Sequence, residues 1–185
     1  MIENKTFNSI DFSSIGLVEE YDNCQFVNCN FTKANLSNIK LVECDFEACN
    51  FSQTKWNHTS IQACEFTDCK MLGIDFSGVN PFLLKMNFHQ CQLNLSSFYA
   101  LKLKEIQFIG CQLNETDFVQ TDLTKANFSE CQLRGATFEQ SILIEADFRT
   151  AEGFSIDPSK NRIRKAKFRK DNVLGLLHSF EIKVA

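Results

Sequence analysis

The sequence has little of what usually punctuates a globular fold. Only 7 of its 185 residues are Gly and 2 are Pro, which is too few turn residues for a fold with many irregular loops. No apolar run approaches the length that spans a bilayer, and the N-terminus MIENKTF has no apolar signal core. These absences predict a soluble, cytoplasmic protein that makes no use of a membrane.

Other residue types are plentiful. Phe occurs 19 times, and an apolar content of 44% is ample for a buried core. The nine cysteines are odd in number and come without a secretion signal, which favours reduced thiols over a disulfide framework. The composition therefore predicts an ordered domain in which something repetitive replaces the usual loops.

A large apolar residue, which we call the centre, returns every five positions. One register runs without a break from Phe26 to Phe76, and a second, displaced by two residues, runs from Phe88 to Phe148. A small residue stands two places before most centres. Self-similarity at a fixed period predicts a solenoid, in which each repeat packs only on its neighbours.

The period also predicts the shape of each coil. Neither a helix nor a long strand keeps a five-residue pattern on one face, so the chain turns a corner in each repeat. Phe and Leu alternate strictly in the second register, which requires an even number of sides, and Cys24, Cys44 and Cys64 recur at twenty residues, which selects four. We therefore expect an all-β solenoid of about seven square coils, ~34 Å long at ~4.8 Å per coil.

We number the four faces by their columns of centres. Face 1 carries Phe26, Phe46, Phe66, Phe88, Phe108, Phe128 and Phe148. Faces 2, 3 and 4 begin at Phe31, Leu36 and Leu41 and repeat at the same spacing.

Three segments are predicted. Residues 1–20 form an irregular N-terminal cap coil, and residues 21–157 form the β-helix. A register break at 77–85 adds two residues on face 4, near the centre Leu83, and because Pro81 cannot donate to a ladder we expect a small loop at Asn80, Pro81 and Phe82. Residues 158–185 form a tail with a charged crossing segment over 161–170 and a helix over 172–179 that Asp171 caps.

The tail is too apolar for a lone exposed helix. Its apolar residues include Leu174, Leu176, Leu177, Phe180 and Ile182. Either the tail seals the end of its own coil, or it also pairs with a second copy by two-fold symmetry.

The charges are divided along the chain. Residues 1–157 hold 21 acidic against 11 basic residues, a net charge of −10, whereas residues 158–185 hold 2 against 8, a net charge of +6. The square wrapping places on face 1 the acidic residues Asp45, Glu47, Glu65, Asp68, Glu130 and Asp147, with Arg149 as the only base, and on the adjoining corner Glu43, Glu105 and Glu145. Such a stripe either keeps the stacked coils soluble or enters a groove evolved for DNA.

No catalytic or metal-binding pattern is present in the sequence. All nine cysteines stand two places before a centre, no histidine shares their columns and no CxxC pair occurs, so we expect core packing and no metal. His58, His89 and His178 are isolated, and a convex rod offers no cleft that would shift a carboxyl pKa. We therefore predict a protein that is not an enzyme and has no cofactor.

Stretches such as Cys44-Asp45-Phe46, Ala126-Asn127-Phe128 and Ala146-Asp147-Phe148 resemble the pentapeptide-repeat family over about residues 21–150. The segment 152–184 is similar to the closing segment of the quinolone-resistance and microcin-immunity members. That resemblance implies a right-handed quadrilateral β-helix, a homodimer through the tail, and mimicry of B-DNA toward DNA gyrase and topoisomerase IV. Quinolone-resistance members of Gram-negative type carry larger projecting loops than this chain, so toxin immunity, plain inhibition of gyrase and an unknown native role stay open beside quinolone resistance.

Two other functions stay open at this stage. The protein can be a scaffold or binding module for an unrelated protein partner. Alternatively, its basic tail contacts nucleic acid or another anionic partner, although the acidic rod beside it argues against direct nucleic-acid binding. The basic residues concerned are Arg162, Arg164, Lys165, Lys167, Arg169 and Lys170.

Overall fold

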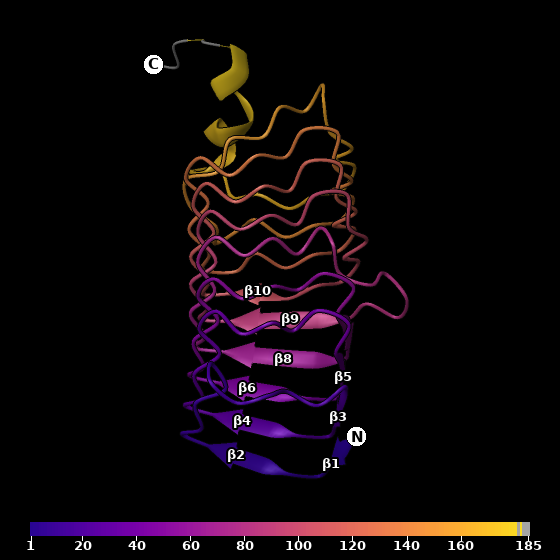
Figure 1. Cartoon of the computed structure of the whole chain (residues 1–185). Coiled ribbons are helices and arrows are strands. Elements are labelled where there is room, and N and C mark those ends of the chain that lie inside the picture. Colours follow the sequence, from indigo (N-terminus) through magenta and orange to yellow (C-terminus); the bar gives the residue numbers. More distant parts are fainter. Residues whose placement is uncertain (181, 183–185) are drawn as a thin grey trace.

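The computed structural model describes residues 1–180 and 182. The chain winds into a four-sided parallel β-solenoid with its termini at opposite ends (Figure 1). On face 4 the strands pair in the order β1-β3-β5-β7, and on face 1 in the order β10-β9-β8-β6-β4-β2. The face 4 strands are β1 (Ile2–Glu3), β3 (Glu20–Asp22), β5 (Lys40–Val42) and β7 (Ser60–Gln62). The face 1 strands are β2 (Thr6–Asn8), β4 (Gln25–Val27), β6 (Asp45–Glu47), β8 (Cys64–Thr67), β9 (Met86–His89) and β10 (Phe108–Ile109).

The predicted columns of identical side chains form the core. On face 1 the rings stack with centroids 4.7–5.5 Å apart, in the order Phe7, Phe26, Phe46, Phe66, Phe88, Phe108, Phe128, Phe148 and Phe168. They meet the face 3 rings edge to face, as Phe98 meets Phe108 at 5.4 Å and 73°. Because Phe7 and Phe168 extend the column at its two ends, the stack is longer than the about seven coils that the sequence predicted.

The corners are turned mostly without glycine. In most repeats the residue two places after the centre adopts the left-handed region, for example Lys33 (φ 62°) and Lys125 (φ 59°). A side chain inside the turn often supports it: Asn127 Oδ1 accepts hydrogen bonds from the backbone N–H of Ser129 at 3.0 Å and from its hydroxyl at 2.6 Å. These local bonds, together with the ladder on either side, offset the cost of the left-handed conformation.

All nine cysteines are free and buried, as predicted. Each thiol lies against backbone carbonyls; Cys49 Sγ, for example, is 3.3 Å from Phe26 O and 3.4 Å from Glu47 O. Burial raises the pKa of the Cys64 thiol well above its ordinary value. Within the described residues no cluster of His, Cys, Asp and Glu is arranged to hold a metal ion.

The first coil is more regular than the predicted irregular cap over 1–20. Strands β1 and β2 pair with β3 and β4, and Asp11 bridges to Asn30. Phe7 stacks on Phe26 at a spacing of 19 residues, one short of a full coil. The irregular part is therefore confined to the segment that follows Phe12 and ends before Glu20.

The β-helix also continues past its predicted end at residue 157. Arg162 bridges to Ile142 and Lys167 to Asp147, and Phe168 stacks on Phe148 at 5.5 Å. The prediction of a crossing segment over 161–170 is therefore wrong, because these residues complete a last coil.

The tail forms two short 3-10 helices at the C-terminal end of the rod instead of one helix capped by Asp171 (Figure 1). They are η1 (Val173–Leu176) and η2 (His178–Phe180). Asp171 instead pairs with Arg169 at 3.0 Å. Asn172 holds the tail by donating its amide hydrogens to the carbonyls of Phe148 at 2.9 Å and Ala151 at 3.1 Å. No helix of the described chain is long and apolar enough to cross a membrane.

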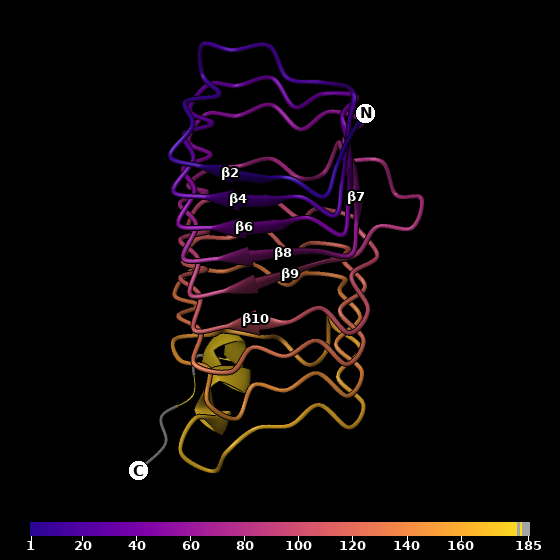
Figure 2. The ribbon, with the colours of Figure 1, turned by 90° about the horizontal axis from the view of Figure 1, so that it is seen from below.

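The register break lies where it was predicted. Residues 81–84 project from face 4 as a loop, visible at the right-hand side of Figure 2. Leu84 is half-buried and packs against the core, whereas Leu83 is 63% exposed. The side chain that packs inward on face 4 at this level is therefore that of Leu84, not that of the predicted centre Leu83.

Candidate binding face

Face 1 presents a row of short strands whose outward side chains form regular columns. In strands β4, β6 and β8 the residue before each centre is Gln25, Asp45 and Glu65, and these three stand in register. Because the strands are parallel and in register, the side chains of one column lie one coil apart at ~4.8 Å. The charge of each part of face 1 therefore depends on which residues occupy successive coils of the same column.

The N-terminal half of this face holds a cluster of carboxylates that we call the acidic patch. It consists of Glu43, Asp45, Glu47, Glu65 and Asp68, of which Glu65 is half-exposed and the others are exposed. Asp45 and Glu65 are direct ladder partners, and like charges in that position are destabilising. No Lys or Arg of the described chain lies within 4 Å of any of the five; the one ionisable neighbour is His89, whose Nε2 is 3.4 Å from Glu65 Oε2.

The middle of face 1 is neutral. The same column continues there as Asn87, Gln107 and Asn127. Asn87 Nδ2 donates to Glu65 Oε1 at 2.8 Å, and Asn127 Nδ2 donates to Gln107 Oε1 at 3.0 Å. This amide ladder interrupts the continuous acidic stripe that the sequence predicted.

The C-terminal part of face 1 is neutralised and then basic. Arg149 contacts Asp147 with Nη2 2.6 Å from Oδ2, and Lys167 Nζ lies 3.8 Å from the same oxygen. The hydrogen bonds from Arg149 lower the pKa of Asp147 below its ordinary value. The last coil adds Lys167, Arg169 and Lys170, so Arg149 is not the only base on this face, and Glu130 stands apart from the acidic patch.

The corner between faces 4 and 1 alternates in charge. From the register break onward, the corner position three residues before the face 1 centre is occupied in successive coils by Lys85, Glu105, Lys125, Glu145 and Lys165. Lys125 Nζ lies 3.4 Å from Glu105 Oε1. Glu105 and Glu145 therefore belong to a charge-balanced column, and the intervening lysines, which recur at a spacing of one coil, were missed when the acids alone were assigned to faces.

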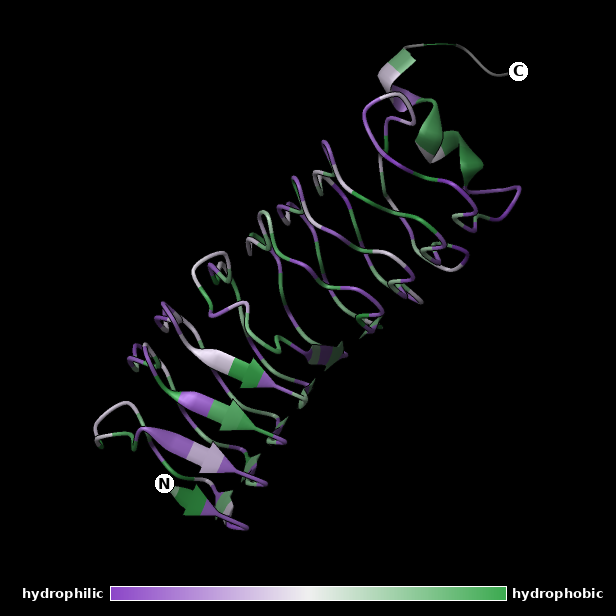
Figure 3. Cartoon of the chain, turned by 90° about the vertical axis from the view of Figure 1, so that its right-hand side faces the viewer, coloured by the Kyte–Doolittle hydropathy of each residue, from purple (hydrophilic) through white to green (hydrophobic). Residues whose placement is uncertain are grey.

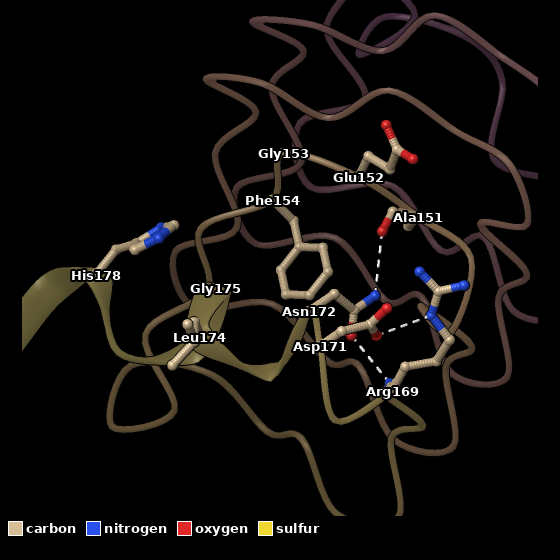
Figure 4. A pocket seen from close by; sticks show the side chains of 10 residues that line it. All are labelled: Ala151, Glu152, Gly153, Phe154, Arg169, Asp171, Asn172, Leu174, Gly175 and His178. Atoms are coloured by element: carbon tan, nitrogen blue, oxygen red, sulfur yellow. Dashed lines mark hydrogen bonds and ion pairs between the residues drawn. The ribbon is translucent and has the colours of Figure 1, made fainter. Parts of the chain in front are cut away.

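The predicted tail residues divide into two groups. Leu174, Phe180 and Ile182 are 43–56% exposed, whereas Leu176 and Leu177 are half-buried. Gly175 is buried against Phe154, and Figure 3 shows η1 coloured as apolar at the C-terminal end of the rod. Beside it lies a cleft of about 330 Å³, lined in part by Phe154, Arg169 and His178 (Figure 4).

The profile of the family described as "Pentapeptide repeat region" matches residues 20–81 and 83–154, most of the chain. The chain belongs to the pentapeptide-repeat family. A search of curated proteins gave no match.

Among solved structures, two trypsin-treated variants of QnrB1, a plasmid-mediated fluoroquinolone resistance protein, are similar to this pentapeptide-repeat protein over its whole length. One is 15% identical, with a TM-score of 0.65 and coverage of 99% of each chain. The other is 15% identical, with a TM-score of 0.64 and coverage of 100% of this chain and 98% of that one. At this identity the similarity shows the parallel β-solenoid fold.

Proposed function

We propose that this pentapeptide-repeat protein binds a type II topoisomerase, DNA gyrase or topoisomerase IV, in the cytoplasm, and that its acidic patch occupies a surface that otherwise contacts DNA. The observation that carries the proposal is the patch itself: five carboxylates without Lys or Arg partners in the described chain, on two adjacent coils of a regular face. A groove that binds DNA is lined by cations that attract such a surface. The whole-length likeness to QnrB1 supports the proposal.

The dimensions of the rod fit this role. Nine stacked rings on face 1 span eight steps of ~4.8 Å, or ~38 Å, a little more than one turn of duplex DNA. Asp45 and Glu65, the two successive carboxylates of one column, stand ~4.8 Å apart, whereas phosphates along one DNA strand repeat at ~3.4 Å of helix axis. The protein needs no catalytic group for this function, and members of its family typically act as non-enzymatic scaffolds.

We also propose that the protein forms a homodimer through its tail. Leu174, Phe180 and Ile182 expose apolar surface at one end of the rod, which a two-fold axis would bury in a self-complementary contact. The acidic patch lies in the other half of the rod. The dimer would therefore present its two patches near its two far ends.

A supercoiling titration tests the topoisomerase proposal. The protein is added to gyrase and to topoisomerase IV, alone, with a quinolone and with a peptide toxin that poisons the enzyme. We expect the wild type to reduce supercoiling or to relieve the poison, and the double variant Asp45→Lys, Glu65→Lys to lose the effect. The matched control Glu115→Lys, Glu152→Lys reverses two exposed acids on face 2 and is expected to behave as wild type.

Each arm of this titration has a distinct meaning. Relief of the quinolone indicates resistance, relief of the toxin indicates immunity, and reduced supercoiling alone indicates plain inhibition. No binding and no effect in any arm would refute the proposal. Equal loss of effect in the control pair would remove the acidic patch from the interface.

The basic last coil favours a second candidate function. Among the described residues, no carboxylate lies within 4 Å of Arg162, Arg164, Lys165 or Lys170. Such a surface binds nucleic acid or another polyanion through its phosphates. Retention on immobilised duplex DNA that falls steeply with salt, and that is lost in the variant Arg162→Glu, Arg164→Glu, would favour this function over DNA mimicry.

A further inference from the structure

The ladder of backbone hydrogen bonds on face 4 is interrupted around the loop of residues 81–84, most completely on the side of the following coil. Between the coils of Leu103 and Leu123 the step is complete: Leu103 N–H donates to Asp122 O at 2.8 Å, Glu105 N–H to Thr124 O at 2.8 Å and Asp122 N–H to Leu101 O at 2.9 Å. The three equivalent bonds between the coil of residues 79–85 and the next coil are absent from the described structure. The N–H and C=O of Lys102 and the C=O of Lys104 therefore have no backbone partner in a neighbouring coil.

The two extra residues of the loop cause this interruption. Pro81 takes the place of the centre in the backbone ladder, directly after Asn80, but its side chain is exposed and it has no N–H to donate. Phe82 N–H turns back to Asn80 Oδ1 at 2.9 Å, and Leu83 adopts the left-handed region with φ 54°. The chain consequently leaves the ladder after Asn80 and returns to it at Lys85, whose N–H donates to Ile61 O at 3.0 Å. Phe82 is 68% exposed. The loop that carries it projects from the side of the rod (Figure 1).

A cleft of about 540 Å³ lies at the base of this loop, and we call it the loop cleft. Its lining is partly apolar and partly polar, and consists of Leu84, Lys85, Met86 and Asn87 together with residues 103–107. Its volume is within the range of sites that bind small ligands or a few residues of a peptide. Leu84 and Met86 supply apolar walls. Lys104, whose C=O is unpaired, is part of the lining, and Lys102 directly precedes the lining residue Leu103 in the chain.

The charge around the loop cleft is positive, in contrast to the acidic rod. No carboxylate of the described residues lies within 4 Å of Lys85 or Lys102. The two acids nearby are already paired, Asp122 with Lys104 at 3.6 Å and Glu105 with Lys125 at 3.4 Å. Four lysines against two carboxylates leave this site with a local net charge of +2.

We propose that the loop cleft binds an extended acidic peptide segment of a partner protein. The segment would pair its backbone with the free N–H and C=O of Lys102 and the C=O of Lys104, as a strand adds to an exposed edge. Its acidic side chains would face Lys85 and Lys102, and one apolar side chain would lie against Leu84 and Met86. This site is on face 4 and uses none of the carboxylates of the acidic patch, so it does not depend on the topoisomerase proposal.

Fluorescence anisotropy with a labelled peptide tests this inference on the full chain. The probe is fluorescein-labelled Asp-Leu-Asp-Val-Asp with a blocked C-terminus, and we expect saturable binding. The variant Lys85→Glu, Lys102→Glu is expected to weaken binding at least about tenfold, because the new carboxylates would repel the acidic side chains of the peptide. The matched control Lys33→Glu, Lys55→Glu changes the net charge equally on faces 2 and 3 and is expected to leave binding unchanged.

Two further probes separate backbone pairing from simple charge attraction. A peptide N-methylated at alternate residues loses half of its donors, so one of the two methylated forms is expected to lose binding and the other to keep it. A variant lacking Pro81 and Phe82, in which the ladder can close, is expected to lose binding while remaining folded. No binding of the wild-type peptide, equal binding of a Lys-Leu-Lys-Val-Lys peptide, or equal weakening by both lysine pairs would overturn the proposal.

Discussion

Removing the two extra residues of the loop is expected to stabilise the protein, provided that the correct two are removed. Deletion of Pro81 and Phe82 joins Asn80 to Leu83 and restores the five-residue period. Leu83 then stands at the face 4 centre, where Leu41, Leu103, Leu123 and Leu143 stand in other coils. The backbone N–H of Leu83 can then donate to the ladder, whereas Pro81 has no N–H to donate.

The size of the effect follows from the bonds regained. Three backbone hydrogen bonds at a net ~1 kcal/mol each give about 3 kcal/mol. Little packing is lost, because Phe82 is 68% exposed and Leu83 takes over the half-buried position of Leu84. For a chain of this length such a gain raises the melting temperature by about 6–12 °C.

The measurement is urea unfolding followed by the fluorescence of Trp56, the only tryptophan, which is buried and donates its indole N–H to Thr54 at 2.8 Å. The matched control deletes Leu83 and Leu84 instead. It shortens the loop equally but leaves Pro81 at the centre, so we expect it to be less stable than wild type. The explanation by regained ladder hydrogen bonds would be refuted if the two deletion variants had equal urea midpoints, or if both were less stable than wild type.

Four other outcomes are expected, three from single substitutions and one from labelling of the native protein. Gly175→Ala should undock the tail, because its Cβ would lie 2.5 Å from a ring carbon and 2.6 Å from the carbonyl oxygen of Phe154, and light scattering should show the loss of the dimer. In the native protein all nine thiols, Cys64 included, should resist a thiol reagent and react only on unfolding, whereas rapid native labelling would contradict their burial. Asp147→Asn should cost about 0.5–1 kcal/mol at pH 7 in urea titrations. Since the folded pKa of Asp147 is lowered, that difference should be constant above its ordinary value of 3.8 and vanish as the pH falls through the lowered pKa. Asp45→Lys should raise stability by about 0.2–1 kcal/mol, and a loss would mean that the acidic patch is not under repulsion.

The five-residue period was sufficient to predict the number of sides, the columns and the burial of the cysteines. Each of these follows from which residues recur at twenty, and nothing outside the repeat is needed. The same rule also applies to Ala166-Lys167-Phe168, which repeats Ala146-Asp147-Phe148 one coil later. The lysines and arginines around it led to the prediction of a charged crossing segment, although the outward positions of a solenoid accept residues of any charge.

Two features could not be predicted from the pattern. The corners use left-handed residues of many kinds, 24 of them other than glycine in the part of the chain that the structure describes, so the scarcity of glycine did not indicate a scarcity of turns. At the tail, Asp171 and Asn172 are both residues that cap helices, and the pattern does not choose between them. The structure uses Asn172, whose amide donates to carbonyls at the open end of the last coil, a partner that local sequence cannot reveal.

The acidic patch is best interpreted by comparing it with the neighbouring corner column, in which charges alternate. The sequence assignment considered each acid by itself and did not consider which residues lie one coil above and below it. Two acids assigned to face 1, Asp68 and Glu130, adopt the left-handed conformation of the corner that follows it. On the corner between faces 4 and 1, Lys85, Glu105 and Lys125 alternate, so this chain does neutralise stacked charges where it has a run of them. On the neighbouring strands Asp45 is instead stacked on Glu65, at a cost of about 0.2–1 kcal/mol. Solubility alone would be served equally well by the alternating arrangement, so the unbalanced one favours a surface kept for binding a cationic partner.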